Sequence, residues 1–277
     1  MAMRCIQLAF GLRLAGLILA PIVCIRPALA QNAQVIEVPT RGQKMRALLL
    51  TPANPVGSVI LLAGGHGNLA LGKDGKMGWG AGNQLVRTRA GYAKAGFVTA
   101  VPDIAPDLKQ GKGGVPQSRW SEELARDIGA LVKHLRGLKE PVYLVGTSRA
   151  ALSVAKAAVV LSGAERPDAI VVTSGMLVHI TDAQPSAQRS VGGLGRITQP
   201  TFIVYHQKDG CAYTPASSAS KAKALLTGAK KVDIKILTGG SAGSGDPCEA
   251  RSHHGFEGQD DEVVQVVTGW LKGLGKP

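Results

Sequence analysis

The apolar positions of this chain fall into short runs that alternate with stretches of helical periodicity. Eight runs rich in Val, Ile, Leu and Ala have the length of β-strands. They cover residues 34–38, 45–51, 58–63, 97–101, 142–145, 169–173, 201–205 and 232–237. Proline or glycine stands at several of their ends, as at Pro39, Gly64 and Pro102, where such residues end regular structure. The pattern predicts a sheet of about eight strands.

Four further segments have the apolar spacing or composition of helices. They are residues 83–95, a segment capped by Ser121 that runs to Leu135, residues 150–161 and residues 262–274. Helical crossovers between successive strands require a mostly parallel sheet with right-handed connections. Since the sequence has no internal repeat and no long linker, we expect one α/β domain over residues 31–277.

The first thirty residues have the features of a secretory signal peptide. Arg4 and Arg13 precede or flank an apolar run over residues 14–25, and Ala28-Leu29-Ala30 matches a small-residue cleavage site. The apolar run is shorter than the roughly 20 residues that cross a bilayer comfortably. We therefore expect a periplasmic or secreted protein that begins at Gln31 and has no stable membrane span. An uncleaved membrane anchor is the alternative.

Export would leave two cysteines, Cys211 and Cys248, in the mature chain. Two thiols in an oxidising compartment commonly pair. A bridge across such a long loop would contribute roughly 3–4 kcal/mol in the chain-entropy model. The alternative is a pair of separate buried thiols.

The composition is basic but does not indicate a nucleic-acid partner. The net charge is +13, and the first thirty residues contain three arginines and no acidic residue, so about +10 remains after cleavage. A nucleic-acid site concentrates basic residues in patches with interleaved aromatics. Here the basic residues are scattered and aromatics make up only 4% of the chain. We interpret the charge as a solvated surface.

A candidate nucleophile follows the predicted strand 142–145. The segment Gly146-Thr147-Ser148-Arg149-Ala150 joins that strand to a helix rich in alanine. Small residues on both sides of a serine in a strand–turn–helix context are typical of a nucleophile elbow, a sharp turn that projects the hydroxyl above the sheet. A helix-capping serine is the alternative interpretation of Ser148.

A serine hydroxyl needs a base to remove its proton, and the base needs an orienting group. Asp209 follows the predicted strand 201–205, and His254 lies in a glycine-rich loop after the last strand. The order Ser, Asp, His is the order of elbow-bearing hydrolases. Cys211 is two residues after Asp209, and Cys248 is six residues before His254. A disulfide would therefore hold the proposed acid loop against the proposed base loop.

An acyl-transfer site also needs donors for the oxyanion. One predicted donor is the backbone N–H of Arg149, directly after the nucleophile. The second is expected in the turn after strand 58–63, where Gly65 is preferred and His66 is the second choice. A merely flexible turn is the alternative.

Taken together, the segments SVILLAGGHG, GTSRA, PTFIVYHQKDGC and HHGF resemble the α/β-hydrolase superfamily, in particular its small serine esterases and dienelactone hydrolases. The resemblance spans nearly the whole mature chain. It implies an α/β-hydrolase fold, and it selects His254 over His253 because the histidine before Gly-Phe is usually catalytic in that superfamily. The lipase motif His-Gly-Gly-Gly and a long segment for a lid are missing, so the resemblance favours small or medium substrates.

Several other residues are weaker candidates for a role in the site. Asp182 follows the sixth strand and is the reserve candidate for the acid. Asp103 and Asp107 are interpreted mainly as turn formers. Arg87, Arg89 and Arg149 could meet a substrate carboxylate or could simply be solvated. The histidines have no metal-ligand spacing, and no cofactor motif is present, so we expect neither a metal nor a cofactor.

The sequence thus supports a serine hydrolase that acts on a small-molecule, ester-like substrate through Ser148, Asp209 and His254. Its rival is an exported protein that retained the hydrolase fold and uses the cleft only for binding. The oligomeric state is open.

Overall fold

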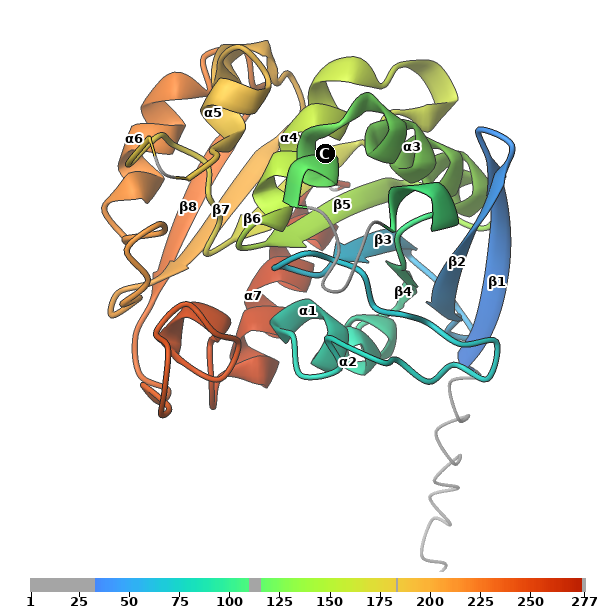
Figure 1. Ribbon diagram of the computed structural model, residues 1–277, viewed down its shortest axis with the longest axis horizontal. Coiled ribbons are helices and arrows are strands. Elements are labelled where there is room, and N and C mark those ends of the chain that lie inside the picture. Colours follow the sequence, from blue (N-terminus) through green and yellow to red (C-terminus); the bar gives the residue numbers. More distant parts are fainter. Residues whose placement is uncertain (1–32, 110–115, 183, 276–277) are drawn as a thin grey trace, which may run out of the picture. The chain divides into compact units, whose positions relative to one another are not determined.

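The structure of the protein is a computed structural model that describes residues 33–109, 116–182 and 184–275. The predicted signal peptide and its cleavage after Ala30 lie outside the described residues. The described part contains one eight-stranded sheet with helices on both of its faces (Figure 1).

The sheet has the strand order β1-β2-β4-β3-β5-β6-β7-β8. Its strands are β1 (Ala33–Thr40), β2 (Gln43–Leu50), β3 (Gly57–Leu62), β4 (Phe97–Pro102), β5 (Val142–Thr147), β6 (Ala169–Thr173), β7 (Thr201–His206) and β8 (Val232–Leu237). β1 pairs with β2, and β2 with β4, in antiparallel fashion, while every later pairing is parallel. The predicted eight-stranded, mostly parallel sheet is therefore confirmed. The two antiparallel pairings lie at its N-terminal edge.

The helices form two layers that cover the sheet. α3 (Glu122–Arg136), α4 (Ala150–Val160), α5 (Ala187–Ser190) and α6 (Ser218–Leu225) lie on one face, and α1 (Gln84–Arg87), α2 (Arg89–Lys94) and α7 (Asp260–Gly273) lie on the other (Figure 1). Each face has its own apolar core. All six residues of β3, β4, β5 and β7 are buried, as a strand covered on both sides requires.

Two helical predictions need correction. The expected helix over residues 83–95 is divided into α1 and α2 at Thr88, whose hydroxyl donates to the carbonyl of Gln84 at 2.7 Å. That side-chain bond competes with the helical ladder and helps to end the first helix. The sequence analysis also missed α6, which buries mainly Ser218, Ala219 and Ala222 and thus has little apolar periodicity.

The described residues between β6 and β7 form no long lid. Within the described residues, that connection contains only the four-residue α5 and a short 3₁₀ turn, Leu194–Arg196. The carboxyl ends of the parallel strands are consequently open to the loops that follow β3, β5, β7 and β8.

Close packing at the start of α4 makes Gly146 a position where any side chain should be costly. A Cβ built on Gly146 would lie 2.5 Å from Cγ2 of Val154 and 3.1 Å from the carbonyl oxygen of Ala150. We expect Gly146→Ala to lower the free energy of unfolding by about 1–3 kcal/mol because α4 must move off the sheet. Urea denaturation followed by circular dichroism measures the change.

The matched control is Gly269→Ala in the exposed part of α7, where an added Cβ meets nothing within 4 Å. Because alanine is the better helix former, this variant should gain about 0.5–1 kcal/mol. Equal effects of the two substitutions would contradict the packing argument.

Candidate active site

Ser148 occupies a strained turn between β5 and α4. Its φ angle is 55°, in the left-handed region that a residue with a side chain rarely adopts. The turn is held from both sides, since the Ser148 N–H donates to the carbonyl of Thr173 at 3.0 Å and its carbonyl accepts from the N–H of Met176 at 3.2 Å. β5 runs through Thr147, two residues beyond the predicted strand, and so leads directly into this serine. Strain of this kind is typical of a residue whose position serves a function.

Small residues around Ser148 are a steric requirement of this turn. A Cβ built on Gly64 would lie 3.1 Å from Cβ of Ser148 and 3.2 Å from the carbonyl of Thr147. Ala150, which stands where related motifs have glycine, is completely buried at the first position of α4. The backbones of β3, β5 and α4 therefore converge on the serine and leave its side chain partly exposed.

Asp209 and His254 are hydrogen-bonded to each other in the loops after β7 and β8. The Nδ1 atom of His254 lies 3.0 Å from Oδ2 and 3.3 Å from Oδ1 of Asp209. The carboxylate is fully buried, and the imidazole is 4% exposed. A buried carboxylate requires donors, and Asp209 also accepts the backbone N–H of Cys211 at 2.9 Å. The structure thus brings together the two residues that the sequence analysis selected for this pair.

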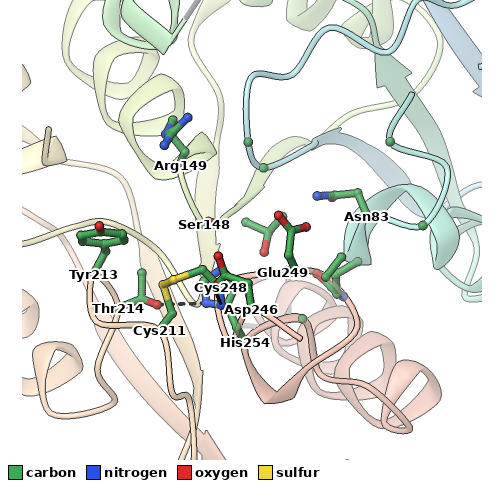
Figure 2. A pocket seen from close by; sticks show the side chains of 18 of the residues that line it. Asn83, Ser148, Arg149, Cys211, Tyr213, Thr214, Asp246, Cys248, Glu249 and His254 are labelled. Carbon is green, nitrogen blue, oxygen red and sulfur yellow. Dashed lines mark hydrogen bonds between the residues drawn. A yellow bond between two sulfur atoms is a disulfide. The ribbon is translucent and has the colours of Figure 1, made fainter. Parts of the chain in front are cut away.

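Thr214 is the member of this cluster that the sequence analysis missed. Its hydroxyl lies 3.0 Å from Oδ2 of Asp209 and 2.9 Å from Nδ1 of His254, and the residue has no exposed surface. Figure 2 shows the contact between Thr214 and His254 as a dashed line. A threonine five positions after a candidate acid has no distinctive signal in a single sequence.

A disulfide joins Cys211 to Cys248 and crosses between the two loops. The expected pairing is present, and it connects the loop of Asp209 to the loop of His254. Figure 2 shows the bond beside His254 and Thr214. Because the bridge lies next to the acid–imidazole pair, it limits how far the two loops can separate.

The histidine loop is also held from below by Arg87. Its guanidinium donates to the carbonyls of Ala250 and Gly255, at 3.1 and 2.7 Å, and pairs with Asp260. Arg87 is therefore a structural support of the loop and is neither solvated nor turned toward a substrate. Arg89 also stays within its own helical region, where it donates to the carbonyl of Val86.

The neighbouring histidine, His253, pairs with His206. His253 stacks on His206, with ring centroids 4.2 Å apart and planes 4° from parallel. Burial and the neighbouring His253 lower the pKa of His206, so this imidazole favours its neutral form. Its Nδ1 accepts the N–H of Lys208, and its Nε2 lies 3.0 Å from the carbonyl of Gly239. These contacts give His206 and His253 a structural role.

Ser148 and His254 line one cavity of about 610 Å³. The Nε2 atom of His254, opposite the atom that contacts Asp209, is buried and has no hydrogen-bond partner among the described residues. The Ser148 hydroxyl likewise makes no hydrogen bond within that part of the chain. His254 and Ser148 thus line the same cavity, and their side chains are not hydrogen-bonded to each other.

The three candidate oxyanion residues also line this cavity. Within the described residues, the backbone N–H groups of Gly65, His66 and Arg149 have no acceptor. Gly65 has φ +57°, and a Cβ on it would lie 3.0 Å from the ring of Trp79. A glycine is therefore needed where the loop passes under Trp79.

Asp103 and Arg119 fix the loop that carries Gly65. The carboxylate of Asp103 accepts the N–H groups of Leu69 and Leu71 at 2.8 and 2.9 Å, and the guanidinium of Arg119 donates to the carbonyl of Ala63. Arg119 is almost fully buried, and desolvation lowers its pKa to about 9. Asp103 is therefore an organiser of the loop, as its interpretation as a turn former suggested. Asp107 instead pairs with Arg41.

Charges of both signs border the cavity. Burial, followed by the charges of Arg119 and Arg149, lowers the pKa of His66, whose ring lies against that of Trp79 with centroids 3.7 Å apart and planes tilted by 37°. Asp246 and Glu249 contribute carboxylates from the histidine loop. Figure 2 shows Arg149 directed away from His254, so the guanidinium and the candidate base lie at different parts of the cavity.

Asp182 does not occupy the position of a catalytic acid. Its side chain is 86% exposed and pairs with Arg189 at 2.7 Å. His254 contacts Asp209 instead, so the reserve assignment is wrong in geometry.

Over the described ranges, no group of three or more His, Cys, Asp or Glu side chains is arranged to hold a metal ion. The described segments also contain no helix long and apolar enough to cross a membrane.

Comparison with solved structures reveals many folds of the same kind. A dienelactone hydrolase from Anabaena variabilis is similar with a TM-score of 0.54 and 16% identity, over 88% of this chain and 98% of that one. An esterase from Pyrococcus furiosus is similar with a TM-score of 0.58 and 13% identity, over 88% and 93%. An alpha-beta serine hydrolase homologue from Coxiella burnetii gives 0.59 and 14%, over 86% and 97%.

No protein-family model matches the sequence, and no curated protein matches it either. At these identities the structural likeness concerns the fold, and the assignment of the site depends on the geometry described above.

The disulfide generates a stability prediction. It closes a sequence separation of 37 residues, so its removal in Cys211→Ser/Cys248→Ser should cost about 3–4 kcal/mol of unfolding free energy by relaxing the unfolded chain. Urea unfolding of the oxidised protein and the double variant measures this difference. Peptide mass mapping without reductant should recover a Cys211–Cys248 cross-link, and free thiols at both positions in exported protein would contradict the pairing.

Proposed function

The chain has the α/β-hydrolase fold, and we propose that it is an exported serine hydrolase that cleaves small or medium esters. Ser148 is the nucleophile, His254 the general base and then the general acid, and Asp209 the group that orients the imidazole. The observation that carries this assignment is one buried hydrogen-bonded pair. His254 contacts Asp209 through Nδ1 and has an unpartnered Nε2 beside the cavity that also contains Ser148.

The first chemical step is attack of the Ser148 oxygen on the ester carbonyl. As the new O–C bond forms, Nε2 of His254 takes the hydroxyl proton, and the carbonyl π electrons move onto its oxygen. Collapse of the tetrahedral intermediate expels the alcohol, which receives that proton from Nε2. Water then repeats the sequence on the acyl-enzyme, releases the acid and regenerates the serine.

The proposed mechanism requires the Ser148 side chain to reach Nε2 of His254 when substrate is bound. The two groups make no hydrogen bond in the free protein, and catalytic hydrogen bonds often tighten only in the substrate complex. A rotation about one side-chain bond of a partly exposed serine is a small change.

The backbone N–H groups of Arg149 and Gly65 are proposed to bind the oxyanion, with His66 as the alternative to Gly65. Both preferred donors lack an acceptor in the described part of the chain. A donor already fixed in place needs no reorganisation when negative charge develops, which is the basis of its catalytic effect. Bonds from Asp103 and Arg119 keep the Gly65 loop in one conformation.

The cavity argues for a small substrate. Its volume of about 610 Å³ falls in the usual range for small-molecule sites. The short β6–β7 connection offers no long cover for an extended acyl chain. Export is supported by the disulfide, since such bonds persist in oxidising compartments.

The nucleophile is tested with Ser148→Ala. The mature protein should hydrolyse a short-chain nitrophenyl ester, and the variant should lose about 10³-fold or more in kcat because no covalent intermediate can form. A fluorophosphonate probe should label Ser148, as located by peptide mass spectrometry. Wild-type protein that neither hydrolyses a panel of esters, thioesters and amides nor reacts with the probe would favour the rival function, a binding protein with a hydrolase fold.

The acid is tested with a matched pair of variants. Asp209→Asn should lower kcat by about 10³–10⁴-fold because an amide no longer selects the tautomer with a bare Nε2. Asp182→Asn changes the same group at the exposed position and should leave kcat within about twofold of wild type. A large loss in Asp182→Asn with normal activity in Asp209→Asn would reverse the assignment.

A further inference from the structure

The hydroxyl of Thr214 lies between the two members of the acid–imidazole pair. The three atoms form a closed triangle: Oγ1 is 3.0 Å from Oδ2 of Asp209 and 2.9 Å from Nδ1 of His254, and Nδ1 is 3.0 Å from Oδ2. Thr214 and the Asp209 side chain have no exposed surface. The hydroxyl therefore has no access to bulk water and must satisfy its hydrogen bonds within the triangle.

A rigid turn fixes the position of this hydroxyl. The N–H of Thr214 donates to the carbonyl of Cys211 at 3.0 Å, and the N–H of Cys211 donates to Oδ1 of Asp209 at 2.9 Å. Cys211 is further tied to Cys248, and Pro215 follows Thr214 and restricts the backbone. The same turn that holds the acid thus also aims the threonine at it.

Two proton arrangements are possible in this triangle. In the first, Nδ1–H of His254 donates toward Asp209, the Thr214 hydroxyl donates to Oδ2, and Nε2 is bare. In the second, the hydroxyl donates to a bare Nδ1, and the proton of the imidazole is on Nε2. Only the first leaves His254 able to accept a proton from Ser148.

The buried carboxylate decides between the two arrangements. In the first, Asp209 has three donors: the N–H of Cys211, the hydroxyl of Thr214 and Nδ1–H of His254. In the second, it keeps only the N–H of Cys211. Hydrogen bonds to a charged acceptor are the strongest available, and a buried carboxylate short of donors is costly, so the first arrangement is favoured.

We propose that Thr214 is a positioning residue that acts through Asp209 and His254. Its hydroxyl donates to the carboxylate and offers its lone pair to Nδ1–H, which holds the imidazole in the tautomer with a bare Nε2. When the imidazole becomes charged during the reaction, the same arrangement persists, so no proton has to move on the Asp209 side. This inference depends on the proposed serine mechanism and adds a fourth group to it.

Thr214→Val keeps the shape of the side chain and removes the hydroxyl. We expect kcat to fall about tenfold with KM changed by less than twofold, because the variant impairs the base and leaves the other cavity walls intact. Asp209, with one donor fewer, attracts the imidazolium more strongly, so the acidic limb of the kcat/KM profile should move to higher pH by about 0.5–1 unit.

The other ionisable groups near His254 are common to both proteins. They are His66, Tyr213, Asp246, Glu249 and Arg149 on the cavity wall, Arg87 under the loop, and the stacked pair His206 and His253. A difference between the two profiles therefore reports the loss of the hydroxyl.

Two further variants separate the hydroxyl from simple packing. Thr214→Ser retains the hydroxyl and should restore kcat and the acidic limb to within about twofold and 0.2 pH unit of wild type. Thr268→Val removes a buried hydroxyl whose bonds in the described part of the chain stay within its own helix, to Val264 and Gln265. This control should change neither kcat nor the profile. If Thr214→Val does not fold, Thr214→Ala replaces it in the comparison with Thr214→Ser.

A measurement without turnover keeps this inference distinct from the proposed function. In ¹⁵N-histidine NMR spectra of the wild-type mature protein, His254 should show a downfield Nδ1–H proton and a bare Nε2. In Thr214→Val the downfield signal should shift and exchange faster. A wild-type imidazole protonated on Nε2 overturns the inference, as does a Thr214→Ser variant as impaired as Thr214→Val. Full activity in Ser148→Ala would instead remove the serine mechanism and leave the NMR result to decide the role of Thr214.

Discussion

A carboxylate with no exposed surface sets the conditions for the whole candidate site. Removing such a charge from water costs several kcal/mol unless donors surround it, and Asp209 has donors on three sides, from Cys211, Thr214 and His254. Each donor belongs to a loop that could otherwise adopt many conformations. The need to satisfy this one group therefore orders the turn after β7 and attaches the histidine loop to it. The disulfide and Arg87 strengthen an attachment that the electrostatics already require.

The serine side of the site depends on steric exclusion. Ser148 adopts a left-handed conformation where β3, β5 and α4 converge, and the close packing there leaves little room for a side chain on Gly64 or Gly146. The strain is balanced by burial of the small-residue face of α4 against the sheet. Polar contacts thus hold one half of the site, and close backbone packing holds the other. The cavity lies between the Ser148 turn and the histidine loop, which these two kinds of interaction hold in place.

The loop that carries Gly65 illustrates a third way of holding a backbone in place. Two buried ionisable side chains, Asp103 and Arg119, bond to its main-chain groups, and Asp103 also pairs with Lys109. Both charged groups are already hydrogen-bonded within the protein and are therefore not available to bind a substrate. The N–H groups of Gly65 and Arg149 consequently face the cavity without acceptors of their own. A site organised in this way keeps its donors fixed before any ligand arrives.

Local sequence patterns were sufficient for much of this description. Runs of apolar residues determine which segments are strands, since a strand covered on both faces must be apolar throughout, and the order of Ser148, Asp209 and His254 follows from their places at strand ends. The pairing of Cys211 with Cys248 could also be predicted from the sequence, because only these two cysteines remain after the expected cleavage. Helix boundaries were harder to predict. At Thr88, a hydrogen bond from the side-chain hydroxyl to the carbonyl of Gln84 accompanies a break in a continuous helical pattern.

Only the tertiary structure determined which polar side chains are hydrogen-bonded to one another. Thr214 has no local signature, and its importance arises from a triangle with a residue 40 positions away. The same holds for Arg87, which resembles a surface cation in the sequence and is in fact buried beneath the histidine loop. Periodicity reports whether a residue faces a core, because that depends on near neighbours along the chain. The partner of a buried polar group depends on how distant loops meet, and this information exists only once the sheet has formed.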